Sequence, residues 1–153
     1  MALKVIFLDF DGVLNSAKYL LGCGDCGMAI DPTRMVLLMR IVDATGAKIV
    51  LSTSWREHWS KDLASCDSTG VLINNIFSEY GLQILDKMPE LHTRREIEIK
   101  SWLDEHPEVE NYVVFDDRLL SADYLYGHFI KTSNYLDGLD EMDVQKAIAI
   151  LNR

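Results

Sequence analysis

The chain has 153 residues, of which 48% are hydrophobic and 25% are charged, so we expect one globular domain over residues 1–153. Its formal net charge of -9 argues against extensive duplex DNA binding, because phosphate backbones need clustered lysine and arginine. No apolar stretch is long enough to span a bilayer, and residues 2–9 are too short to be a signal peptide, so we expect no membrane partner.

Three cysteines, Cys23, Cys26 and Cys66, give an odd number, and no secretory leader is recognisable. Both features are typical of a reducing compartment, so we expect a cytoplasmic protein. Cys23 and Cys26 form a CxxC motif, but zinc usually takes four ligands, and no second CxxC or histidine pair follows. We therefore expect a Gly-rich loop there, with zinc as the alternative.

The first predicted element is a buried strand at residues 3–10, a short apolar and β-branched run. A Gly/Cys loop follows it. Asp31 and Pro32 are suited to the N-cap and the first helical position, and the apolar spacing predicts a helix that ends near Gly46. The run AKIVLSTS, residues 47–54, predicts the second strand.

The segment SWREHWSKDLAS, residues 54–65, predicts a helix that starts as the second strand ends. Residues 67–91 give no clear pattern, because glycines interrupt them and a Met-Pro pair suggests a loop. Thr93 and Glu96 have the spacing of a capping box, which predicts a helix through about Glu105.

The last third of the chain contains two more predicted strands, NYVVFDD at residues 111–117 and HFIKTS at residues 128–133. Asp140 then caps a final helix. Strands that alternate with helices predict a mainly parallel sheet covered on both faces. We therefore expect a Rossmann-like three-layer α/β/α sandwich.

Polar side chains follow three of the predicted strands: DFD at residues 9–11, STS at residues 52–54 and FDDR at residues 115–118. Ligands of parallel sheets bind outside the carboxyl ends of the strands, so we expect these groups to meet at one edge. Carboxylates gathered there repel one another, and a hard divalent cation removes that repulsion. Mg²⁺ prefers a few carboxylates with waters and phosphate oxygens, so this edge predicts a magnesium site for phosphate chemistry.

The pair Asp9 and Asp11 suggests how such chemistry could proceed. An aspartate can attack phosphorus, and a second acid can protonate the leaving oxygen and then deprotonate water. Alternate residues of a strand point to opposite faces, so the chain must leave strand geometry for both acids to share a site. Gly12 makes such a turn easy.

These segments resemble the motifs of the haloacid dehalogenase-like (HAD) phosphatases, in the same order. VIFLDFDGVL is similar to their first motif, IVLS to the second and VVFDD to the fourth. The phrases LSTSWR, REIEIKSWL, VVFDDR and DGLDEMDVQKAIAIL are similar to the capless HAD domains of RNA-repair proteins of the Swiss Army Knife type.

The resemblance implies that Asp9 is the nucleophile and a Mg²⁺ ligand. Asp11 would be the acid/base, with its backbone carbonyl on the metal. Ser52 would bind a phosphoryl oxygen, a role that Thr53 could share.

Asp117 would be the remaining protein ligand of Mg²⁺, with Asp116 beside it orienting a basic residue. Which of these two acids touches the metal varies within the family, so both stay candidate ligands.

The third motif is where this sequence departs from the resemblance, because the family usually has a lysine there. The candidates here are Arg94, Arg95, Lys87 and Lys100. Counting back from the apolar face of the following helix favours Arg95, which could neutralise Asp9 and bind phosphate. Arg94 also opposes the helix dipole, which suggests an anionic partner. Arg56 could contact substrate phosphate or form a surface salt bridge.

The resemblance implies a Mg²⁺-dependent phosphohydrolase that acts through an aspartyl-phosphate. No strand set for a large cap domain is evident between the motifs, and an open site favours a nucleic-acid end or a nucleotide as substrate. The acidic composition keeps small phosphoesters open. Two other classes are a non-catalytic binding module of this fold and a signalling receiver domain, which the acid-free STS strand end disfavours.

Overall fold

The computed structural model describes residues 2–23 and 29–153. Its centre is a sheet of five parallel strands in the order β3-β2-β1-β4-β5. The strands are β1 (Leu3–Leu8), β2 (Lys48–Leu51), β3 (Ile84–Lys87), β4 (Val109–Asp116) and β5 (Phe129–Lys131). Cys26 of the CxxC motif lies outside the described residues.

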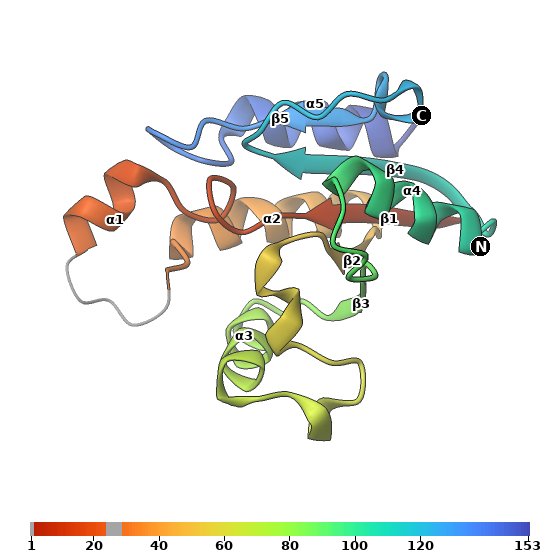
Figure 1. Cartoon of the computed structure of the whole chain (residues 1–153). Coiled ribbons are helices and arrows are strands. Elements are labelled where there is room, and N and C mark those ends of the chain that lie inside the picture. The colour runs from red at the N-terminus through yellow and green to blue at the C-terminus, as the bar shows by residue number, and fades with distance from the viewer. Residues whose placement is uncertain (1, 24–28) are drawn as a thin grey trace.

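Helices cover both faces of the sheet (Figure 1). The helices of the described residues are α1 (Ala17–Cys23), α2 (Pro32–Thr45), α3 (Ser68–Glu79), α4 (Arg95–Glu105) and α5 (Glu141–Leu151), of which α1 lies apart from the sheet and buries no residue. Strand β1 supplies both layers of the core, because its side chains alternate between faces. Ile6 and Leu8 pack with α2, α3 and α5, whereas Val5 and Phe7 pack with α4. The predicted Rossmann-like sandwich is therefore confirmed.

Helices α2 and α5 begin as the sequence predicts. Asp31 is the N-cap of α2 and accepts a hydrogen bond from the Thr33 N–H, and Gly46 closes the helix with φ +71°. Asp140 is the N-cap of α5. Within the described residues, no helix combines the length and the apolar character that a membrane crossing requires.

The predicted helix at residues 54–65 is wrong. The segment forms two short 3₁₀ turns, Ser54–His58 and Leu63–Ser65. The Lys87 ammonium donates hydrogen bonds to the carbonyls of Arg56 and Trp59, at 3.0 and 2.8 Å. In a continuous α-helix these carbonyls would accept bonds from backbone N–H groups. Lys87, which is distant in sequence, takes these acceptors, so the segment does not continue as an α-helix.

Three further differences concern the loop after β1, residues 67–91 and the start of α4. The loop after β1 contains helix α1, and residues 67–91 contain α3 and the edge strand β3. The predicted capping box at Thr93 is wrong, because Arg94 is the N-cap of α4 and makes no side-chain capping bond. The Glu96 carboxylate accepts a hydrogen bond from the Ser121 N–H instead, at 3.3 Å.

Candidate active site

The site forms at the carboxyl ends of β1 and β4, where Gly12 turns the chain out of β1. Gly12 has φ +78°, and a Cβ atom there would lie 2.5 Å from the Asp117 side chain. A residue with a side chain would be strained in its backbone and would also collide with that acid. The Thr132 hydroxyl donates to the Gly12 carbonyl at 2.5 Å and fixes the turn against the end of β5.

Three carboxylates meet beside this turn. Asp9 and Asp116 are buried and Asp117 is half-buried, and one oxygen from each lies within 4.8 Å of the others. Asp9 also accepts a hydrogen bond from the Phe10 N–H at 2.8 Å. Oxygen ligands at such spacing suit a hard divalent cation, so the trio could hold Mg²⁺.

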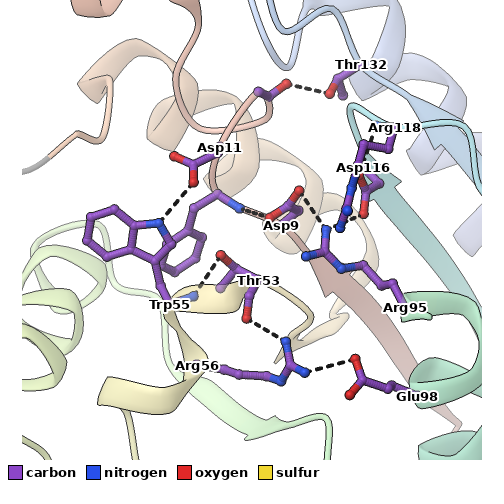
Figure 2. A network of polar contacts seen from close by, with 12 residues as sticks. Asp9, Asp11, Thr53, Trp55, Arg56, Arg95, Glu98, Asp116, Arg118 and Thr132 are labelled. Atoms are coloured by element: carbon purple, nitrogen blue, oxygen red, sulfur yellow. Dashed lines mark hydrogen bonds and ion pairs between the residues drawn. The ribbon is translucent and has the colours of Figure 1, made fainter. Parts of the chain in front are cut away.

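Arg95, the first residue of α4, lies between two of these acids (Figure 2). Its Nη1 is 3.0 Å from Asp9 Oδ2 and 2.6 Å from Asp116 Oδ2. Burial raises the pKa of Asp9 to about 7; Arg95 opposes this rise, and Asp116 adds to it. Burial also raises the pKa of Asp117. A divalent cation would favour the charged form of all three acids.

Asp11 is exposed, and its carboxylate turns away from the trio (Figure 2). The Trp55 indole N–H donates to Asp11 Oδ2 at 3.1 Å, and the Asn15 amide donates to Oδ1 at 3.1 Å. The Asn15 side chain also accepts from the Gly12 N–H at 2.8 Å. The loop therefore orients the second acid of the DFD segment separately from the first.

Ser52 and Thr53 are both buried at the end of β2, but their hydroxyls differ. The Ser52 N–H donates to the Leu8 carbonyl, which places Ser52 beside the end of β1. Among the described residues, its Oγ has no hydrogen-bond partner. Thr53 Oγ1 instead accepts from the Trp55 N–H at 3.3 Å and caps the following turn. Of the two hydroxyls, that of Ser52 is therefore the one that no described residue satisfies.

A family model described as "HAD domain in Swiss Army Knife RNA repair proteins" matches residues 5–144. The chain belongs to this family. The predicted resemblance is confirmed, and the chain is placed in the HAD superfamily of phosphohydrolases. No curated protein and no solved structure matches the chain. HAD domains generally use Mg²⁺, which agrees with the chemistry of the acidic trio.

The other basic candidates of this HAD domain have different partners. Lys87 holds the turn after β2, and Lys100 pairs with Asp104 on the exposed face of α4. Arg56 is buried, and its guanidinium donates to the Thr53 carbonyl at 3.0 Å and to Glu98 at 2.9 Å. Its ion pair is therefore internal, contrary to the surface salt bridge considered from the sequence.

A hollow of about 300 Å³ adjoins the HAD site on the side of Arg95. Its lining residues are Ser54, Arg56, Glu57, Glu90, His92, Thr93, Arg94, Arg95, Glu98 and Arg118. Sequence reasoning did not select Arg118 or Glu98 as site residues, although Arg118 directly follows the paired acids in FDDR. Trp55 packs against the core and also donates its indole N–H to Asp11.

Proposed function

We propose that this HAD domain is a Mg²⁺-dependent phosphohydrolase that acts through an aspartyl-phosphate and removes phosphate from nucleic-acid ends or nucleotides. The observation that carries the proposal is the trio of Asp9, Asp116 and Asp117, with Arg95 bridging two of its members. Mg²⁺ bound by the trio would neutralise the charge of the acids and of the phosphoryl oxygens.

Asp9 and Asp11 divide the chemistry in this proposal. An Asp9 oxygen attacks phosphorus and forms a P–O bond while the bond to the leaving oxygen breaks. Asp11 gives its proton to that oxygen. It then takes a proton from the water that attacks the phosphoryl group, which releases inorganic phosphate and restores Asp9. Trp55 and Asn15 hold the Asp11 carboxyl away from the trio, so it would have to turn toward Asp9 for both transfers.

Arg95 and Ser52 provide hydrogen-bond donors beside Asp9. Arg95 holds Asp9 in place and supplies positive charge where the transferred group carries negative charge. The buried Ser52 hydroxyl, which has no hydrogen-bond partner among the described residues, donates to a phosphoryl oxygen. A buried polar group without a partner is costly, and a phosphoryl oxygen would satisfy it.

The substrate class rests on the family and on the absence of a cap. Strand β3, which lies between the second motif and α4, joins the central sheet, and the described residues contain no separate cap domain. An open site admits a large phosphorylated end, and the family description refers to RNA repair proteins. A small phosphomonoester and a non-catalytic binding role stay as alternatives, and a cytoplasmic location stays a prediction.

The test is phosphate release with Mg²⁺ and with EDTA, from p-nitrophenyl phosphate, sugar phosphates, mononucleotides and 5′- and 3′-phosphorylated oligonucleotides. We expect Mg²⁺-dependent turnover that falls by about 10³-fold or more in Asp9→Asn. Asp104→Asn, which removes an exposed acid of α4, is the matched control. Turnover of small esters alone favours the small-molecule alternative, and no turnover by the folded protein with Mg²⁺ favours the binding module.

A further inference from the structure

Four of the seven arginines of the chain, Arg56, Arg94, Arg95 and Arg118, line the hollow beside the trio. We propose that this hollow binds a second phosphate of the substrate, next to the phosphate that reacts at Asp9. The inference rests on the proposed function for the identity of the reacting group. Arg95 joins the two places, because it lines the hollow and also contacts Asp9.

Arg94 is the first observation that supports an anionic ligand. It is exposed and occupies the N-cap of α4, where the helix dipole favours anions and where Ser, Thr, Asp or Asn is preferred. Within the described part of the chain, its guanidinium has no ion-pair or hydrogen-bond partner. A phosphate in the hollow would neutralise this charge and would also complement the positive end of α4.

Arg56 is a second and independent observation. It is 8% exposed, and its Nε has no hydrogen-bond partner among the described residues. The rest of its guanidinium is fixed by the Thr53 carbonyl and by Glu98. Arg56 therefore places a fixed guanidinium on the wall of the hollow, with one N–H group that no described residue satisfies.

Arg118 lies in the loop after β4, close to Asp116 (Figure 2), and also lines the hollow. Its side chain is 61% exposed, and its Nε lies 3.8 Å from Asp116 Oδ1. Arg94 and Arg118 therefore come from different elements, and both could contact one bound anion from solvent.

The acids of the hollow cancel only part of this charge, because Glu98 is the ion-pair partner of Arg56 alone. Glu98 binds Arg56 and the Leu91 N–H. Glu90 lies 3.8 Å from the Lys87 ammonium, and Glu57 lies 3.4 Å from the His58 ring. Arg94, Arg95 and Arg118 thus line the hollow without an ion-pair partner among its glutamates, in a chain whose net charge is -9. A phosphate is the anion that this set of forked donors suits.

A second phosphate can come from two sources, the phosphodiester of an oligonucleotide or the other phosphomonoester of a small bisphosphate. The experiment measures equilibrium binding to the Asp9→Asn protein with Mg²⁺, for a nucleoside 3′-monophosphate, a nucleoside 3′,5′-bisphosphate and a 3′-phosphorylated dinucleotide. It is repeated with Arg94→Gln and Arg118→Gln added, and with Lys100→Gln as the control from α4. Circular dichroism checks that every variant is folded.

We expect the ligands with two phosphates to bind about tenfold more tightly than the monophosphate, and each arginine variant to remove most of this preference. The affinity for the ligands with two phosphates should also depend less steeply on salt concentration in both arginine variants. Lys100→Gln should keep both the preference for these ligands and the salt dependence. Tighter binding of the dinucleotide identifies an oligonucleotide source, and tighter binding of the bisphosphate identifies a small-molecule source.

Equal binding of ligands with one and two phosphates overturns the inference, and so does a preference that survives both arginine variants. The proposed function fails separately. If the preference depends on Arg94 and Arg118 but the unsubstituted protein releases no phosphate from any ligand, the hollow stands as a phosphate site and the hydrolase proposal falls.

Discussion

Helices α4 and α5 both have 11 residues, yet they begin in opposite ways. At α5, Asp140 accepts from the Asp143 N–H at 2.8 Å, and the Asp143 carboxylate accepts from the Asp140 N–H at 3.1 Å. At α4, Arg94 and Arg95 place two cations at the positive end of the dipole, and no side chain caps the helix.

The difference shows which terminus serves the fold alone. The start of α5 satisfies its own backbone donors with its own side chains, which is what stability requires. The start of α4 lacks such bonds and faces the acidic trio and the hollow. Breaks in local rules of this kind are expected at functional sites, where a ligand completes the interactions.

Among substitutions at the two helix starts, the largest expected effect comes from Arg95→Gln. We expect kcat/KM with Mg²⁺ to fall by about 10²–10³-fold, because the transferred phosphoryl group loses a charged donor and Asp9 loses its partner. Arg95→Lys, which keeps the positive charge but not the forked guanidinium, should retain more activity than Arg95→Gln. Full activity in Arg95→Gln would show that the start of α4 has no part in the chemistry.

Asp140→Ala should affect stability and leave turnover unchanged. Loss of the N-cap and of the reciprocal bond with Asp143 should lower the free energy of unfolding by about 1–2 kcal/mol, measured by urea denaturation. A comparable loss of kcat/KM under conditions where the variant is folded would contradict the purely structural role given to the α5 terminus.

Arg94→Asn tests the opposite case at α4. Asparagine is a preferred N-cap, and the substitution removes a cation from the positive end of the dipole, so the free energy of unfolding should rise by about 0.5–1 kcal/mol. Destabilisation would mean that Arg94 has a structural partner, and the contrast between the two helices would then weaken.

The smallest effect concerns Glu141, the first residue of α5. Hydrogen bonds from Arg40 and Gln145 lower the pKa of this exposed acid to about 2, from an ordinary value of 4.5. Because the folded-state pKa is the lower one, the stabilisation is complete above about pH 4.5 and is lost as the pH falls towards 2. The stability difference between the unsubstituted chain and Glu141→Gln, followed by denaturation from pH 7 to pH 3, should therefore shrink in that interval.

Most of the fold follows from local sequence, and the exceptions have identifiable causes. Helix α2 was predicted from Asp31, Pro32 and Gly46, because each of these residues starts or ends the helix through contacts with residues near it in sequence. Strand β3 was missed because its four residues include Asp86 and Lys87, whose partners lie far away along the chain. Asp86 accepts from the Trp102 indole, and Lys87 binds the turn after β2.

The candidate site could also be predicted in part from the sequence. The acids of DFD and FDDR follow apolar strands directly, so their meeting at one edge of the sheet could be inferred from the parallel order alone. The internal pairing of Arg56 with Glu98 could not, because it joins residues 42 positions apart through the packing of α4. The position of Arg118 in the hollow likewise depends on the loop after β4.

Strand register has one more consequence for the candidate active site. Leu8 pairs with Phe115, and the Asp9 N–H donates to the Phe115 carbonyl at 3.3 Å, so Asp9 and Asp116 stand on neighbouring rungs of the same ladder. The central sheet therefore spaces these two carboxylates, and folding itself pre-assembles two of the three acids of the candidate cation site. The loops around the site, and with them the substrates that it accepts, can therefore change in evolution while Asp9 and Asp116 keep their spacing.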